Sequence, residues 1–235
     1  MSDQNEKLKQ LKTSSLDRRL SIAKASLLAG TRWAASSATS IFSSEEDKEK
    51  KRKQAMKEQA EYLVAEIGKL KGSIVKIGQM MALYGEHFLP EEITQALNTL
   101  NNQTVALDWP AIKTQLVRQL GSKLDDIDHE PLGTASLAQV HRATRKSDGL
   151  ELVLKIQYPG VASAIDSDMS LFKNMLKLTR MVPQTREFDQ WFDEVREMMH
   201  REVNYRIEAE TTRRFAARLK EESRYSVPQI IDDYC

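Results

Sequence analysis

The chain has 235 residues, with 35 lysines and arginines against 34 aspartates and glutamates, and 40% of its residues are hydrophobic. A chain of this length and composition buries at least one ordinary core, which excludes a wholly disordered protein. Only 9 glycines and 6 prolines are present, which favours a helix-rich protein over a turn-rich β-sandwich. The single cysteine, Cys235, excludes an intrachain disulfide and a thiolate metal site, and it fits a reducing compartment.

Charge is distributed unevenly along the chain. Residues 1–60 hold 13 basic and 8 acidic residues, a net charge of +5, whereas the remainder holds 22 and 26, a net charge of −4. We expect a cytoplasmic protein, because the uncharged stretch 33–44 is too short to cross a bilayer and the N-terminus lacks a secretory pattern. Residues 1–54 read either as a partly ordered arm or as an amphipathic segment that docks on the inner membrane face or on a partner. A nucleic-acid partner is not expected, because the basic segment has no interleaved aromatic residues.

Three helices are predicted in the first half of the chain. Apolar residues in 54–84 recur at alternating spacings of four and three, which predicts one long helix with a single packed face. These residues are Leu63, Ile67, Leu70, Ile74, Ile77 and Met81. Start and stop signals predict a second helix after Pro90 and a third between Asp108 and Gly121, with Pro110 in its first turn. We expect these helices to form an antiparallel cluster.

The second half begins with strands. Residues 131–143 predict a strand, a small-residue kink at 133–136 and a second strand, and a turn at 147–149 leads to a third strand at 150–156. Helices are predicted at 162–181 and at 188–222, and one more short strand at 227–231. The predicted fold class is therefore α+β and helix-rich, with a small antiparallel sheet.

Two features of the predicted sheet are typical of anion binding. Lys155 lies in an apolar run, so its ammonium needs a carboxylate or phosphate partner, unless it reaches solvent at the sheet edge. The small residues Gly133, Thr134, Ala135 and Ser136 let backbone N–H groups approach an anion, although such a run is by itself often a plain tight turn. A small-residue loop, a strand, a lysine-bearing strand and then a glutamate-rich helix is the order in which protein kinases hold nucleotide phosphates.

The glutamates and histidines limit the chemistry further. Glu202 and Glu208 are six residues apart, so on one helix they lie about 120° apart and need two different partners. The sequence His200-Arg201-Glu202 is not a kinase catalytic loop, because it has Glu in place of Asp and lies within a predicted helix. No metal site is expected, because the four histidines have no ligand-like spacing.

From about residue 55 to its end, the sequence resembles the AarF/UbiB family of atypical protein-kinase-like proteins, which support ubiquinone biosynthesis and related quinone or lipid metabolism. KIGQ at 76–79 is similar to the family's KxGQ signature, and PLGTASLAQVHRA at 131–143 to its alanine-rich loop and following strand. LVLKIQYPG at 152–160 resembles the strand with the nucleotide-binding lysine, and EVNYRIEAE at 202–210 resembles the ExD helix. Four motifs in the family's order are more specific than any one of them.

This resemblance assigns expected roles to particular residues. It implies that Lys155 contacts the phosphates of ATP or ADP together with the loop 133–136, and that Glu208 is the helix partner of Lys155. The remaining motif residues would form a cluster that lies across the place where a protein kinase receives its peptide: Lys76, Gly78, Gln79, Glu202 and Asn204. The implied activity is that of an ATPase or a small-molecule kinase rather than a protein kinase.

The sequence departs from the family pattern in three ways. Asn204 replaces the Asp of ExD, and Gly-Thr-Ala-Ser replaces a run of alanines. The chain also ends before a hinge, a catalytic Asp loop and a metal-binding Asp, so phosphoryl transfer is not expected of it and the main ligands of a nucleotide-bound Mg²⁺ would lie elsewhere. We expect either the N-terminal portion of a longer protein or a truncated relative, with an arm at 1–54, a helical extension at 55–128 and an incomplete kinase-like small lobe at 129–235. The alternative is a non-catalytic module that docks on an anionic membrane or on quinone-biosynthesis proteins through residues 1–60.

Overall fold

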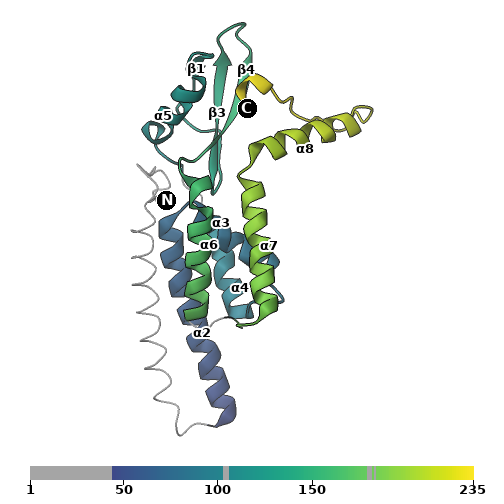
Figure 1. Ribbon diagram of the computed structural model, residues 1–235. Helices are drawn as coiled ribbons and strands as arrows, with labels where there is room; N and C mark the ends of the chain where they lie inside the picture. Colours follow the sequence, from purple (N-terminus) through teal and green to yellow (C-terminus); the bar gives the residue numbers. More distant parts are fainter. Residues whose placement is uncertain (1–43, 103–105, 179–181, 183) are drawn as a thin grey trace.

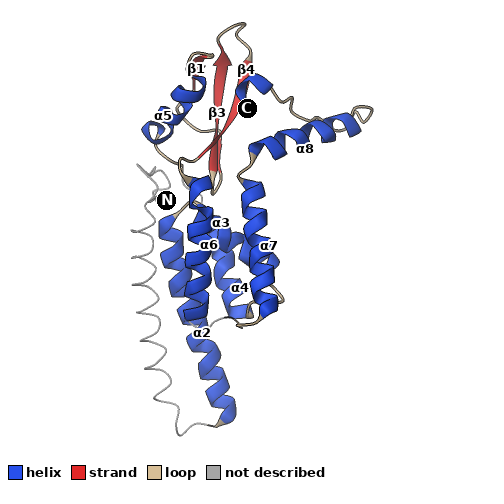
Figure 2. Ribbon diagram, in the orientation of Figure 1, coloured by secondary structure: helices blue, strands red, loops and turns tan. Residues whose placement is uncertain are grey.

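The computed structural model describes residues 44–102, 106–178, 182 and 184–235. A bundle of long helices is joined at one end to a small antiparallel sheet, and helix α8 projects sideways from the junction (Figure 1). The predicted helix-rich α+β class is confirmed, and Figure 2 shows the strands gathered at one end of the long helices. Most of the predicted basic arm lies outside the described residues.

The helical elements are, in chain order, α2 (Glu45–Leu70), α3 (Ser73–Tyr84), α4 (Glu91–Asn98), η1 (Thr99–Asn102), α5 (Trp109–Leu120), α6 (Val161–Leu178), α7 (Arg186–Glu202), α8 (Tyr205–Arg218) and η2 (Asp232–Tyr234). The strands are β1 (Leu124–Ile127), β2 (Gly133–Thr134), β3 (Ala138–Arg145) and β4 (Glu151–Gln157). None of the helices formed by described residues is long and apolar enough to span a bilayer.

The single helix predicted for 54–84 is wrong: α2 already begins at Glu45, and the chain breaks between α2 and α3. Lys71 and Gly72 both have positive φ angles, 57° and 68°, which an α-helix does not allow. The apolar spacing from Leu70 to Ile74 passes through the break unchanged, and both side chains are buried. The hydroxyl of Ser73, the first residue of α3, donates to the buried carboxylate of Asp168 on α6 and so ties the start of α3 to the bundle.

Strand β3 organises the sheet. It pairs antiparallel with β4 along one edge, while β1 and β2 pair with successive parts of β3 along the other. The meander predicted for β3 and β4 is confirmed, but β2 lies inside the predicted kink, and β1 was not predicted. The sheet has one buried face, because residues along β4 alternate between exposed and buried.

Helix α5 has the predicted bounds but not the predicted neighbours. It lies beside the sheet rather than among the long helices (Figure 1). The Trp109 ring stacks on His129 with centroids 4.4 Å apart, and it lies 5.6 Å from the ring of buried His141 on β3. The segment before α5 is attached to β3 as well, since the Leu107 N–H donates to the side chain of Gln139 over 2.9 Å.

The C-terminal part differs from prediction in two places. The helix expected at 188–222 breaks after Glu202, and Asn204 caps a new helix, α8, by accepting a hydrogen bond from the Arg206 N–H. The strand expected at 227–231 does not form: these residues are irregular, and Pro228 has no N–H to offer a neighbouring strand. Tyr234 anchors this segment instead, because its hydroxyl donates to the Lys123 carbonyl over 3.1 Å.

Candidate functional site

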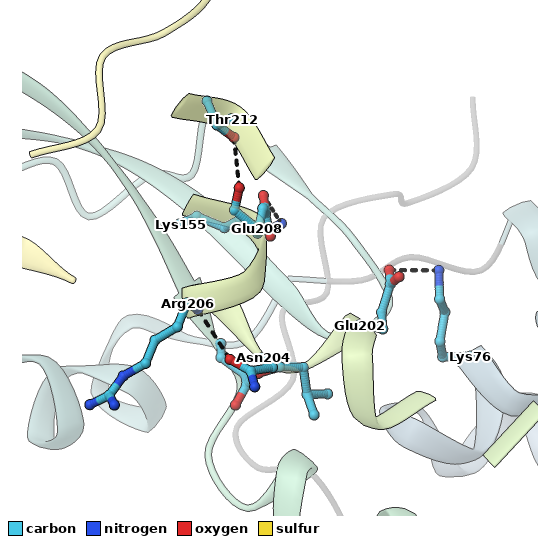
Figure 3. Close-up of polar contacts among 9 residues, drawn as sticks. Lys76, Lys155, Glu202, Asn204, Arg206, Glu208 and Thr212 are labelled. Carbon is cyan, nitrogen blue, oxygen red and sulfur yellow. Dashed lines mark hydrogen bonds and ion pairs between the residues drawn. The ribbon is translucent and has the colours of Figure 1, made fainter. Parts of the chain in front are cut away.

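The ion pair between Lys155 and Glu208 joins the sheet to α8. Lys155 lies on the exposed face of β4 with 45% of its side chain accessible, so its ammonium is not buried in the apolar run that surrounds it in the sequence. Its Nζ donates to both carboxylate oxygens of Glu208, over 2.7 and 2.6 Å (Figure 3). The structure thus brings these two predicted residues together across 53 positions of sequence.

Tyr205 completes this junction from the first turn of α8. The ammonium of Lys155 lies 4.7 Å from the centroid of the Tyr205 ring, a cation–π contact. Burial, and then the nearby carboxylates of Glu208 and Glu202, raise the pKa of the Tyr205 hydroxyl above its ordinary value, so it stays protonated at neutral pH. Sequence analysis missed Tyr205, although its spacing of three from Glu208 on one helix was a signal that the two share a face.

The small-residue loop and the lysine share one rung of the sheet. Gly133 of β2 is paired with Val140 of β3, and Val140 is paired with Lys155 of β4. Residues in register across antiparallel strands point to the same face, so the start of the loop lies two strand spacings from Lys155, about 10 Å. A Cβ built on Gly133 meets nothing within 4 Å, so the space above this end of the rung is open.

The backbone of the loop is only partly available to an anion. The Ala135 N–H already donates to the Ala138 carbonyl over 2.8 Å, closing the turn between β2 and β3. Thr134 is itself a strand residue paired with Gln139, and Ser136 lies in the turn, partly exposed. The open part of the loop is therefore its Gly133 end.

A second ion pair joins α3 to the C-terminal end of α7. Lys76 Nζ lies 2.9 Å from a carboxylate oxygen of Glu202, and the two side chains are 23% and 44% exposed (Figure 3). The two glutamates do have two different partners, as predicted, but the reason differs. Because the helix breaks between Glu202 and Asn204, the two carboxylates belong to different helices.

The other motif residues serve packing and capping rather than this cluster. A Cβ at Gly78 would collide with the side chain of Leu100, so the glycine lets α3 approach η1 closely. The Gln79 amide donates to the Leu100 carbonyl over 3.0 Å and therefore faces η1, not Glu202. Asn204 is the N-cap of α8. The expected five-residue cluster is thus a Lys76–Glu202 pair with three supporting residues placed nearby.

We expect Lys76→Ala to lower the free energy of unfolding by at most about 1 kcal/mol, because a partly exposed ion pair contributes little to stability. Chemical denaturation of the variant beside the wild-type chain measures this. Glu202→Gln, which removes the other charge of the same pair, is expected to have an effect of similar size. A loss well above about 2 kcal/mol for Lys76→Ala would mean that the pair is a structural element of the bundle.

Both ion pairs border one cleft of about 560 Å³ between α3, β4, α7 and α8. Its charged lining residues are Lys155, Glu208, Glu202 and Arg201, with the hydroxyl residues Thr211 and Thr212 beside them. Its apolar lining residues are Met80, Tyr84, Met198 and Ile207. Sequence analysis did not predict the cleft, although Lys76, Met80 and Tyr84 are spaced by four and so form one stripe on α3. Within the described part of the chain, no three His, Cys, Asp or Glu side chains group as metal ligands would.

Residues 99–235 match the ABC1 atypical kinase-like domain, which covers α5, the whole sheet and α6 to α8. The chain belongs to the ABC1 atypical kinase-like family. It is 30% identical over 174 residues to the mitochondrial atypical kinase COQ8 of Schizosaccharomyces pombe, covering 72% of this chain and 28% of that protein. Identity to COQ8 of Saccharomyces cerevisiae is 31%, covering 71% of this chain and 34% of that protein.

A bacterial relative has similar identity and coverage. The probable protein kinase UbiB of Vibrio atlanticus is 31% identical, covering 68% of this chain and 30% of that protein. The chain thus spans about three tenths of the length of these curated relatives. The solved complex of Rv3197 with erythromycin from Mycobacterium tuberculosis aligns with 78% of this chain at a TM-score of 0.45 and 26% identity.

Proposed function

We propose that this chain forms the helical extension and the nucleotide-binding small lobe of an AarF/UbiB-type atypical kinase or ATPase that supports quinone or lipid metabolism. The bidentate pair of Lys155 with Glu208 carries the proposal. It gives an exposed ammonium, fixed in direction by a helix carboxylate, at the edge of a cleft. That is the arrangement by which kinase folds hold nucleotide phosphates.

The residues on the shared rung fit an adenine nucleotide. The open space above Gly133 leaves room for phosphate oxygens on the same face as Lys155. In this proposal Lys155 donates to the phosphates, Glu208 orients Lys155, and the loop 133–136 approaches them from the far end of the rung. The nucleotide would be ATP or ADP, with a bound Mg²⁺ that neutralises phosphate charge.

The reaction itself is proposed to depend on residues outside these 235. The described residues present no cluster of acidic side chains fit to bind Mg²⁺, and the aligned part of the chain covers only 28%, 34% and 30% of the three curated relatives. We therefore propose that the chain binds nucleotide without transferring a phosphoryl group by itself. The Lys76–Glu202 pair lies at one side of the cleft, where it would narrow the approach and favour a small substrate over a peptide.

Thermal unfolding with Mg·ADP tests nucleotide binding directly. A ligand at about a hundred times its Kd stabilises by about 2.7 kcal/mol, which for a chain of this size raises Tm by roughly 5–10 °C. Lys155→Met is expected to abolish the rise. The matched control is Lys113→Met, at an exposed position on α5, which is expected to keep it.

Two results would contradict the proposal. One is a folded wild-type chain whose Tm does not respond to Mg·ADP or Mg·ATP, and the other is an unchanged rise in Lys155→Met. If the unresponsive chain still sediments with anionic vesicles, the result supports the alternative of a docking module without nucleotide chemistry.

A further inference from the structure

We propose that the cleft between α3, α7 and α8 binds a small amphiphilic anion, with its charged group at Arg201 and its apolar body against α3 and α7. The inference deepens the proposed function, because Lys155 forms part of the same wall and the amphiphile would lie next to the nucleotide phosphates. It names a substrate class for the site: a molecule with one anionic group and an apolar chain or ring.

Among the charged residues around the cleft, both carboxylates are paired with a lysine and one further cation is present. Glu208 is held by Lys155 at 2.6 and 2.7 Å, and Glu202 is held by Lys76 at 2.9 Å. Arg201 is exposed, and its guanidinium forms no ion pair with any residue that the structure describes. Both carboxylates of the wall are therefore already neutralised, and the wall favours one further negative charge. A guanidinium suits this role because its planar fork binds carboxylate and phosphate oxygens in pairs.

Three of the four apolar lining residues of the cleft extend along α3 and α7, away from the charged end. Helices α3 and α7 are antiparallel neighbours: the Lys76–Glu202 pair marks one end of their contact, and the bond from Trp191 Nε1 to the Tyr84 carbonyl, 3.1 Å long, marks the other. Those ends are about 12 Å apart along α3, at 1.5 Å per residue. Met80, Tyr84 and Met198 line this length, and methionine side chains adapt to varied apolar ligands.

The size of the cleft favours a small molecule over a membrane surface. Its volume of about 560 Å³ lies within the range of ordinary ligand pockets, roughly 300–1000 Å³. Tyr84 and Ile207 are 49% and 41% exposed at its edge, so a ligand would cover apolar surface that now faces water. One end binds charge and the other removes apolar surface from water, and only an amphiphile satisfies both.

A homologous series of alkyl phosphates, measured by isothermal titration calorimetry without nucleotide, tests the proposal. Butyl, hexyl and octyl phosphate carry the same head group, so their affinities report the apolar part of the cleft. Full burial of each methylene is expected to raise affinity about fourfold, so octyl phosphate should bind at least about tenfold more tightly than butyl phosphate. Arg201→Gln should weaken octyl phosphate about tenfold or more, and Arg118→Gln, an equal charge change on exposed α5, should leave it unchanged.

Several outcomes would overturn the inference. If the three alkyl phosphates, or inorganic phosphate and octyl phosphate, bound with equal affinity, the cleft would not bind an apolar chain. If octanol bound as tightly as octyl phosphate, the cleft would not bind the anionic group. Equal behaviour of Arg201→Gln and Arg118→Gln would place the anion elsewhere, and preferential binding to phosphatidate vesicles would assign the surface to a membrane. Because no nucleotide is present, the titration remains informative even if Mg·ADP fails to stabilise the chain.

Discussion

Replacing Ile74 by alanine is expected to lower the free energy of unfolding by about 2–5 kcal/mol, as large-to-small changes in a packed core do. Ile74 is 0% exposed and lies near the start of α3, the helix that packs against α2, α4, α6 and α7. Truncation of this side chain would therefore leave a cavity inside the packed core. Since Ser73 fixes the start of α3 to Asp168 on α6, the backbone next to the cavity has little freedom to collapse into it.

Leu83→Ala on the same helix is the matched control. Leu83 is 71% exposed, so this substitution should change the free energy of unfolding by no more than about 0.5 kcal/mol. Urea denaturation followed by circular dichroism compares the two variants under one set of conditions. Equal effects of Ile74→Ala and Leu83→Ala would mean that α3 is not the centre of the bundle.

Hydrophobic periodicity was a better guide to the buried faces of the helices than to the residues at which the helices end. From Leu63 to Met81 every residue of the predicted stripe is buried, although the chain breaks at Lys71 and Gly72. The stripe survives because the break keeps Leu70 and Ile74 on one side of the bundle, so a count of spacings cannot detect it. The break after Glu202 is similar: Asn204 is a good N-cap, but the spacing of apolar residues gives no sign of a break at that position.

Contacts between distant segments were predictable only where a motif supplied them. Lys155 and Glu208 are 53 residues apart, and the family resemblance, not any spacing, placed them together. The same resemblance gave Gln79 a place in a charged cluster, whereas its amide binds the Leu100 carbonyl. The cleft is lined by four separate elements, and Arg201 has no ion pair among the residues that the structure describes; both features emerge only when the chain is folded.

The position of α5 was missed partly because the segment before it is bound to the sheet by polar atoms. Gln139 and His141 are 1% and 0% exposed, which is unusual for such residues in a strand. His141 donates from Nδ1 to the Asp128 carbonyl over 2.7 Å, which leaves Nε2 to accept from the Gln139 amide over 2.8 Å. The other end of that amide accepts from the Leu107 N–H over 2.9 Å. Two buried polar residues in one strand were the available signal.

Gln139→Leu is expected to destabilise the chain strongly, although leucine has a similar size. The change leaves the Leu107 N–H and the His141 Nε2 without their partner in a buried site. Each buried polar group left unpaired costs about 1–3 kcal/mol, so the loss should exceed that of an ordinary polar-to-apolar change. Urea denaturation measures the stability, and the fluorescence of Trp109, which lies against His141, reports whether α5 has moved from the sheet.

Gln95→Leu is the matched control for this substitution, because Gln95 is exposed on α4 and, among the described residues, its amide bonds to Glu91 one turn earlier. It should alter stability by about 0.5 kcal/mol or less. If Gln139→Leu proved equally mild, water or a rearranged backbone must satisfy the freed groups, and the network would not hold α5 in place. If the loss of stability is large, then β3, the strand that follows the small-residue loop, depends on α5 for its position. The proposed nucleotide site would then depend on a helix that no nucleotide-binding motif includes.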